Sequence, residues 1–208
     1  MTPRALWVWS GMAGIAGTLC YIAAIAVPWP ETQLGRSLGL LTVSAWPILS
    51  IVYAHGAYAF VAAERESAAN RLSFVFAVAG FTTVLGMIIV QLAVGAGIGE
   101  MTQGLDATMA RAMRRSLRLV DIGLDVAWDM LIGTSLAFMG VAIRRRRGLG
   151  PGWAIPATGL GLALIGLNAA TFPWPPGDRG LFDIGPFIGL FIIALATRIA
   201  ILGRRTVP

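Results

Sequence analysis

Three aspartates recur at helical spacing in one apolar stretch of the chain, which reads LVDIGLDVAWDMLIGTSLAFMGVAI. Asp121, Asp125 and Asp129 are four residues apart and therefore share one face of a helix. Like charges at this spacing repel each other, and an aspartate at the centre of a bilayer costs about 2.5–3.5 kcal/mol on insertion scales. These carboxyl groups are therefore expected to be protonated, to bind a cation or to line water.

Polar residues on neighbouring stretches are candidate partners for these aspartates. Asn168 lies about 15 residues from the predicted inner end of its helix, or ~22 Å, which is the depth of Asp129. Gln91 lies in the outer part of the third apolar stretch. Arg118 precedes Asp121 by one helical turn, within reach of a salt bridge.

Two tryptophans and a fourth aspartate complete the candidate site. Trp46 and Trp128 lie well inside their predicted helices and could offer ring faces to a cation. Asp183 precedes Pro186 by three residues, where a carboxylate can cap a helix. We therefore predict a polar cavity in the outer half of the molecule. Its candidate binding residues are Asp121, Asp125, Asp129, Asn168, Trp128, Gln91, Trp46 and Asp183.

A purely structural interpretation of the same residues is also open. The fourth helix would then begin outside the bilayer, with Asp121 and Asp125 solvated and paired to arginine. Asp129 would be a single buried polar residue bonded to Asn168.

The composition indicates a membrane protein. Of the 208 residues, 57% are hydrophobic and 12% are charged, whereas soluble domains carry about 25% charged residues. This excludes an ordinary cytosolic enzyme, a disordered chain and a basic nucleic-acid module. All 16 basic residues are arginine, and the chain has one histidine and one cysteine. Retinal or pyridoxal Schiff bases, a bis-histidine haem, a disulfide within the chain and thiolate clusters are thereby excluded, and we expect no cofactor.

Six apolar stretches are long enough to cross a bilayer, which needs about 20 residues each. The predicted fold is an all-α bundle of six transmembrane helices forming a single domain over residues 1–208. The predicted spans are 6–27, 37–62, 72–96, 119–143, 153–173 and 185–202.

The link between the third and fourth spans, residues 97–118, is the longest polar stretch. Methionine and leucine recur in it at helical spacing, with four arginines between them. This pattern predicts either an amphipathic helix at the membrane interface or an extension of the fourth helix.

Arginine counts predict the orientation. With the N-terminus inside, ten arginines fall on the inner side and six on the outer side. The positive-inside rule therefore favours cytoplasmic termini. The run Arg144–Arg147 is the strongest anchor, and its simplest role is contact with anionic lipid headgroups.

The C-terminal part of the chain resembles a known group of proteins. The segments GLDVAWDMLIGTSLAFMGVAI and GLNAATFPWPPGDRGLFDIGPFIGL, within residues 120–195, are similar to bacterial six-helix membrane proteins classed as domains of unknown function. This resemblance implies a bacterial inner-membrane protein without an obvious cofactor. The matching residues are Asp125, Trp128, Asp129, Asn168, Phe172, Pro173, Pro175, Gly180, Asp183, Gly185 and Pro186.

The leading functional hypothesis is binding or transport of a cation or a cationic small molecule by the outward-facing acidic cavity. The first alternative is a non-catalytic accessory subunit of a larger membrane complex or a homo-oligomer, because short loops and small-residue faces suit helix packing. The second is a metal-dependent lipid-phosphate enzyme, suggested by the four-residue spacing of Asp125 and Asp129. The sequence favours a protein that is not an enzyme.

Overall fold

The computed structural model describes residues 2–28 and 32–205, and the predicted all-α fold is confirmed. Six helices are long and apolar enough to cross a membrane, so the chain is a multi-pass membrane protein. A short 3-10 helix, η1, lies between the last two long helices. The elements are α1 (Pro3–Ala26), α2 (Gln33–Ala62), α3 (Ala68–Met101), α4 (Ala107–Ile143), α5 (Pro151–Thr171), η1 (Pro176–Arg179) and α6 (Gly185–Arg205).

Polar side chains begin four of these helices. The hydroxyls of Thr2, Thr32 and Ser67 accept hydrogen bonds from the first-turn backbone of α1, α2 and α3. Asp106 does the same for α4, where its Oδ1 accepts from the backbone of Thr108 and Met109. Each cap satisfies a backbone donor that the helix leaves free, so the helix starts are fixed locally by the sequence.

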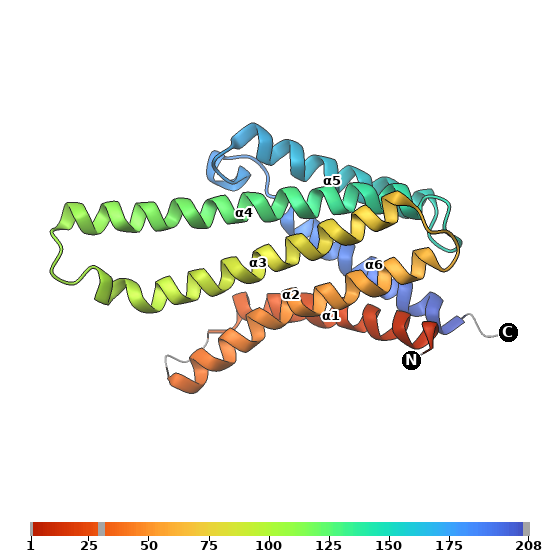
Figure 1. Cartoon of the computed structure of the whole chain (residues 1–208), viewed down its shortest axis with the longest axis horizontal. Coiled ribbons are helices and arrows are strands. Elements are labelled where there is room, and N and C mark those ends of the chain that lie inside the picture. Colours follow the sequence, from red (N-terminus) through yellow and green to blue (C-terminus); the bar gives the residue numbers. More distant parts are fainter. Residues whose placement is uncertain (1, 29–31, 206–208) are drawn as a thin grey trace.

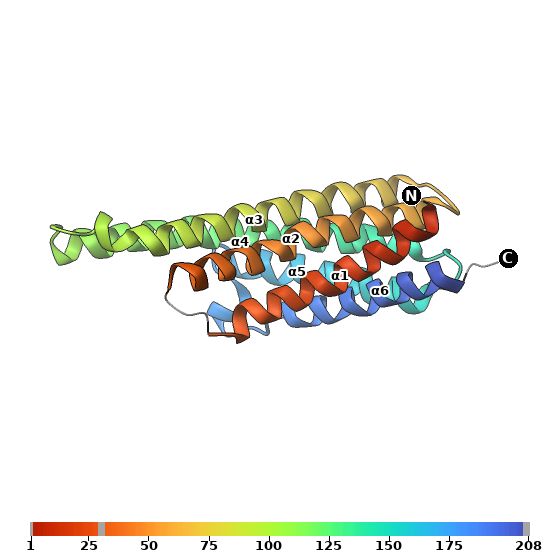
Figure 2. The same cartoon turned by 90° about the horizontal axis from the view of Figure 1, so that it is seen from below.

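The six helices run antiparallel along one long axis (Figures 1 and 2). Both termini and the connections α2–α3 and α4–α5 lie together at what we call the terminal end. The connections α3–α4 and α5–α6 point the opposite way, toward the hairpin end. Helix α4 packs between α3 and α5, while α1 packs against α2 and α6. Both termini therefore lie on the same side; that this side is the cytoplasm stays a prediction.

The core fills the terminal half and the middle of the bundle. One apolar cluster, which includes Phe60, Ile143 and Ile199, joins five helices at the terminal end, and a second, which includes Phe81 and Val84, lies further along. Glycines bring α4 and α5 into close contact. A Cβ on Gly161 would meet the backbone of Gly133, so this approach requires the absence of a side chain.

The segment 97–118 extends existing helices and forms no separate interfacial helix. Helix α3 continues to Met101, and α4 already begins at Ala107, so a long hairpin projects beyond the other helices (Figure 1). Arg114 Nη2 donates to Thr102 Oγ1 across it at 3.3 Å. The extension was one of the two predicted arrangements. The extension is formed because Asp106 caps α4 directly after the turn. The arginine-rich segment and the membrane span therefore belong to one continuous helix.

Candidate functional site

Asp129 and Asn168 meet in the interior, at the depth where the sequence places both. Asn168 on α5 is 1% exposed, and its Nδ2 donates to Asp129 Oδ2 at 2.9 Å and to the Leu164 carbonyl at 3.0 Å. The side chains of Asp121, Asp125 and Asp129 are all half-buried on one face of α4, which we call the aspartate face. The deepest of the three carboxylates is thus held by a neutral amide.

Asp121 is bonded to Gln91 and not to Arg118. Gln91 Nε2 on α3 donates to Asp121 Oδ1 at 2.7 Å. Arg118 instead pairs with Asp178 of η1, with Nη2 3.2 Å from Oδ2. The expected pair of Arg118 with Asp121 is therefore wrong. The connection between α5 and α6 brings Asp178 beside α4, and the arginine turns outward to it.

Within the described part of the chain, none of the three aspartates lies within salt-bridge distance of a basic group. Asp125 forms no hydrogen bond there, and its electrostatic neighbours are Asp121, Asp183 and Asp178. The neighbours of Asp129 likewise include Asp125 and Asp183. The aspartate face therefore gathers negative charge without a protein cation to balance it.

Two buried polar atoms beside the aspartate face lack a partner among the described residues. These are Asn168 Oδ1, an acceptor, and Trp128 Nε1, a donor. Because both amide hydrogens of Asn168 face acceptors, its oxygen is free to accept. A buried group without a hydrogen bond costs about 1–3 kcal/mol. Water or a ligand at this position would remove that cost.

Aromatic rings from three helices adjoin the aspartates. The rings of Trp46 on α2 and Trp128 on α4 meet edge to face, with centroids 5.6 Å apart. Tyr21 on α1 packs against Trp46 at 4.2 Å and interacts electrostatically with Asp183, Asp125 and Asp129. The sequence interpretation missed Tyr21, although it lies in the last turns of α1 at the same end as the aspartates.

Asp183 lies at the start of α6, as its position before Pro186 predicted. Its Oδ1 accepts a hydrogen bond from the Gly185 backbone at 2.8 Å, and its side chain is exposed. Asp183 interacts electrostatically with both Asp125 and Asp129. Because its side chain is also exposed, it lies at the solvent-facing rim of the aspartate face. The predicted residues thus come together from α2, α3, α4, α5 and the start of α6.

The two main pockets among the described residues are not lined by aspartate. One is an apolar space of about 40 Å³ in the middle of the bundle, beside Tyr53 and Phe81. The other has a volume of about 300 Å³ and lies among arginines at the terminal end. Within the described residues, no three acidic, histidine or cysteine side chains converge in a way that could hold a metal ion.

No protein-family model, curated protein or solved structure matches this chain. The resemblance to bacterial six-helix proteins stays a prediction.

Proposed function

We propose that the aspartate face binds a cation or a cationic small molecule and allows it to enter the membrane from the hairpin end. The observation that carries this proposal is the imbalance of charge and hydrogen bonding at Asp125, Asp129 and Asn168. Asp129 receives a neutral donor, Asp125 receives none, and the Asn168 oxygen is free. Because the two carboxylates and the amide oxygen are all hydrogen-bond acceptors, a positively charged ligand would provide the donors and the charge that they lack.

The aromatic neighbours suit the same class of ligand. Trp128 and Trp46 present large π surfaces, and Tyr21 adds a third ring beside them. A cation over such faces gains about 0.5–2 kcal/mol, depending on its desolvation. Ring faces and carboxylates together favour an organic cation, which buries apolar surface and carries positive charge.

We place the protein in a bacterial inner membrane, with the hairpin end on the side away from the cytoplasm. The positive-inside rule supports this orientation, because the four-arginine run Arg144–Arg147 lies at the terminal end. In this orientation Asp121 and Asp183 lie near the entrance, and Asp129 is the deepest carboxylate on the path.

Uptake by reconstituted protein tests the proposal. Radiolabelled sodium and tetraphenylphosphonium are the two probes, and Asp129→Asn and Asp125→Asn are the test variants. We expect at least one probe to enter wild-type proteoliposomes and its uptake to fall about tenfold in both variants, which is about 1.4 kcal/mol. Glu100→Gln is the matched control, since this exposed acid near the end of α3 is not among the electrostatic neighbours of Asp125 or Asp129. Uptake that is unchanged in both test variants would contradict the proposal.

A further inference from the structure

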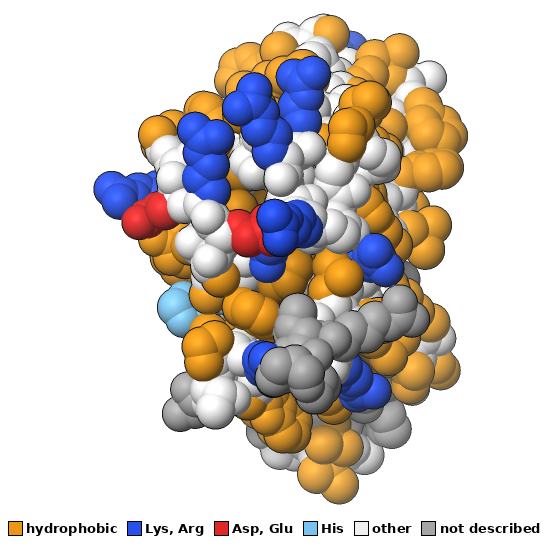
Figure 3. Space-filling model, turned by 90° about the vertical axis from the view of Figure 1, so that its right-hand side faces the viewer, with side chains coloured by type: hydrophobic (Ala, Val, Ile, Leu, Met, Phe, Trp, Pro, Cys, Tyr) orange, Lys and Arg blue, Asp and Glu red, His pale blue; other side chains and the backbone are white. Residues whose placement is uncertain are grey.

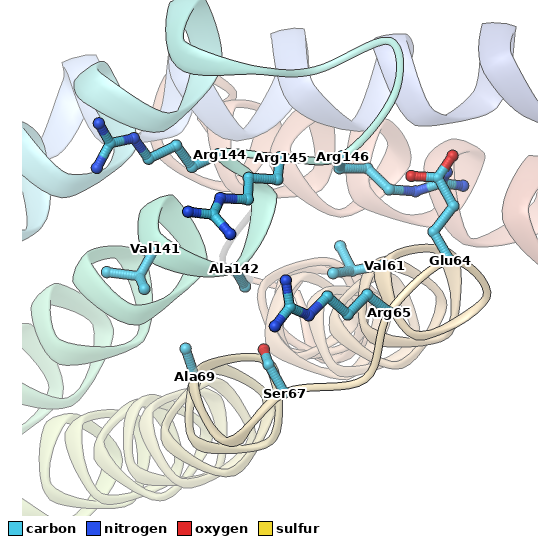
Figure 4. A pocket seen from close by; sticks show the side chains of 10 residues that line it. All are labelled: Val61, Glu64, Arg65, Ser67, Ala69, Val141, Ala142, Arg144, Arg145 and Arg146. Atoms are coloured by element: carbon cyan, nitrogen blue, oxygen red, sulfur yellow. The ribbon is translucent and has the colours of Figure 1, made fainter.

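The terminal end contains a pocket of about 300 Å³ between the α2–α3 connection and the end of α4 (Figure 4). We call it the arginine pocket. Figure 3 shows arginine side chains gathered on this end of the molecule, with few acidic ones beside them. The residues lining the pocket are Val61, Glu64, Arg65, Ser67, Ala69, Val141, Ala142, Arg144, Arg145 and Arg146.

The single acid in the pocket is already engaged. Glu64 Oε1 forms an ion pair with Arg146, and its Oε2 accepts the backbone N–H of Arg147 at 3.0 Å. Arg65, Arg144 and Arg145 have no acidic partner in the described part of the chain. The guanidinium groups of Arg65 and Arg145 face the same space, whereas Arg144 points outward at its rim and Arg146 is turned toward Glu64 (Figure 4). The pocket therefore holds two positive charges without an acidic partner among the described residues, and a third, that of Arg144, lies at its rim.

The walls of the pocket are fixed before any ligand arrives. The Arg146 side chain is 9% exposed, its Nε donates to the Phe60 carbonyl at 3.1 Å, and its guanidinium lies 4.0 Å from the Phe60 ring centre. Across the pocket, fully buried Asn70 donates to the Tyr58 carbonyl at 3.0 Å. These bonds hold the loop that carries Arg65, so binding needs little ordering of the chain.

The chemistry of the lining selects a phosphate group. Guanidinium groups bind phosphate oxygens with paired hydrogen bonds, and several of them balance its charge. The N-terminus of α3, which begins at Ala68 beside the pocket, adds its positive dipole. Val141 and Ala142 make one side apolar, and Val141 is 61% exposed. An anion with an apolar tail fits this combination.

We propose that the arginine pocket is a binding site for an anionic phosphate group, at the opposite end of the molecule from the aspartate face. A phospholipid headgroup, with its acyl chains along Val141, and a free phosphate ion share this chemistry. Arg65 and Arg145 project from opposite walls and provide the contacts, with Arg144 at the rim (Figure 4).

The experiment uses the full chain in a neutral detergent, with binding followed by calorimetry and thermal unfolding. Three probes are titrated: short-chain phosphatidylglycerol, short-chain phosphatidylcholine as a zwitterionic comparison, and inorganic phosphate. The test variant is Arg65→Gln with Arg145→Gln. The matched control is Arg4→Gln with Arg204→Gln, which removes the same charge from the same end but outside the pocket. All four side chains are exposed, so these changes are expected to leave the fold intact.

We expect saturable binding that weakens at least tenfold in the test variant and less than twofold in the control. Binding of phosphatidylglycerol but not phosphate identifies a lipid headgroup, whereas binding of phosphate alone identifies a free anion. Equal weakening in test and control variants overturns the proposal, because it indicates unspecific attraction to charge. If neither phosphatidylglycerol nor phosphate binds, the proposal is overturned as well. The single variant Arg144→Gln repeats the test if the double variant is unstable.

Discussion

The two ends of the bundle bury charge in opposite ways. At the terminal end, Arg146 is surrounded by an acid, a carbonyl and a ring, and burial lowers its pKa against the opposing charge of Glu64. At the aspartate face, Asp129 accepts a hydrogen bond from the neutral amide of Asn168, and the buried amide oxygen of Asn168 has no partner among the described residues. The first arrangement is complete in the protein itself and serves its structure. The second is incomplete, which is why we assign binding to it.

The largest expected effect comes from breaking the complete arrangement. Arg146→Met leaves the Glu64 carboxylate without its ion pair and the Phe60 carbonyl without a donor. Breaking a buried pair costs about 3–5 kcal/mol, and partial exposure of Glu64 reduces this to about 2–3 kcal/mol. Equilibrium unfolding in mixed micelles measures the loss. Arg147→Met is the control, since only its backbone is bonded here, and should change stability by about 0.5 kcal/mol or less. Equal losses in both variants would contradict our account of Arg146.

A somewhat smaller effect is expected where α4 and α5 touch, below Asp129. In Gly161→Ala the new Cβ meets the Gly133 carbonyl and lies 2.6 Å from the Ala137 nitrogen, so the helices must separate. Such overpacking costs about 1–3 kcal/mol and should also loosen the bond between Asp129 and Asn168. Gly159→Ala has no atom within 4 Å of its Cβ and should be neutral or slightly stabilising. If thermal unfolding ranks the two variants equally, the close helix contact is not a determinant of stability.

The aspartate face itself responds to loss of its donor. Asn168→Leu leaves Asp129 without a hydrogen bond and should lower stability by about 1–2 kcal/mol. Removing both partners, in Asp129→Leu with Asn168→Leu, should cost less than the single change, because no buried polar group is then left unpaired. The same unfolding assay compares the two variants. A double variant less stable than Asn168→Leu would show that the carboxylate has a stabilising partner besides the amide.

The smallest expected effect is a pH dependence at the terminal end. Hydrogen bonds from Arg71 and the Tyr58 hydroxyl lower the pKa of Glu66. A carboxylate with a lowered pKa in the folded state stabilises above the ordinary glutamate pKa, and this contribution is lost as the pH falls through the lowered value. The side chains are exposed, so the effect should be smaller than any above. Thermal unfolding of wild type and Glu66→Gln across the acidic range measures it; identical pH profiles would contradict the prediction.

The sequence predicted the positions of side chains along the helix axes better than their contacts with other helices. Counting residues from the inner ends of the fourth and fifth spans placed Asn168 level with Asp129, and the structure joins them by a hydrogen bond. Helical rise is constant, so depth can be read from a sequence. The partner of Arg118 could not be read in this way, because Asp178 is 60 residues away and is brought near only by the packing of η1.

Helix ends show the same limit. The third and fourth spans were predicted as 72–96 and 119–143, whereas α3 and α4 run from Ala68 to Met101 and from Ala107 to Ile143. Hydropathy detects the part of a helix that suits lipid and stops where charge begins, but the hydrogen-bonded helix continues into water.

The packing of individual glycines could not be predicted from the sequence either. Gly161 contacts α4 inside the bundle, whereas Gly159, two residues earlier, has open space around it.

The length of α4 sets the depth of its aspartates. Its 37 residues span about 55 Å, and fitting this into a hydrocarbon layer of about 30 Å would need a tilt beyond the 0–40° that membrane helices adopt. The helix must therefore protrude. At an average tilt of about 20°, counted upward from Arg144, Asp121 lies at the membrane surface, Asp125 about 3 Å below it and Asp129 about 9 Å below it. A single helix face thus forms a graded series of carboxylates from water into the membrane.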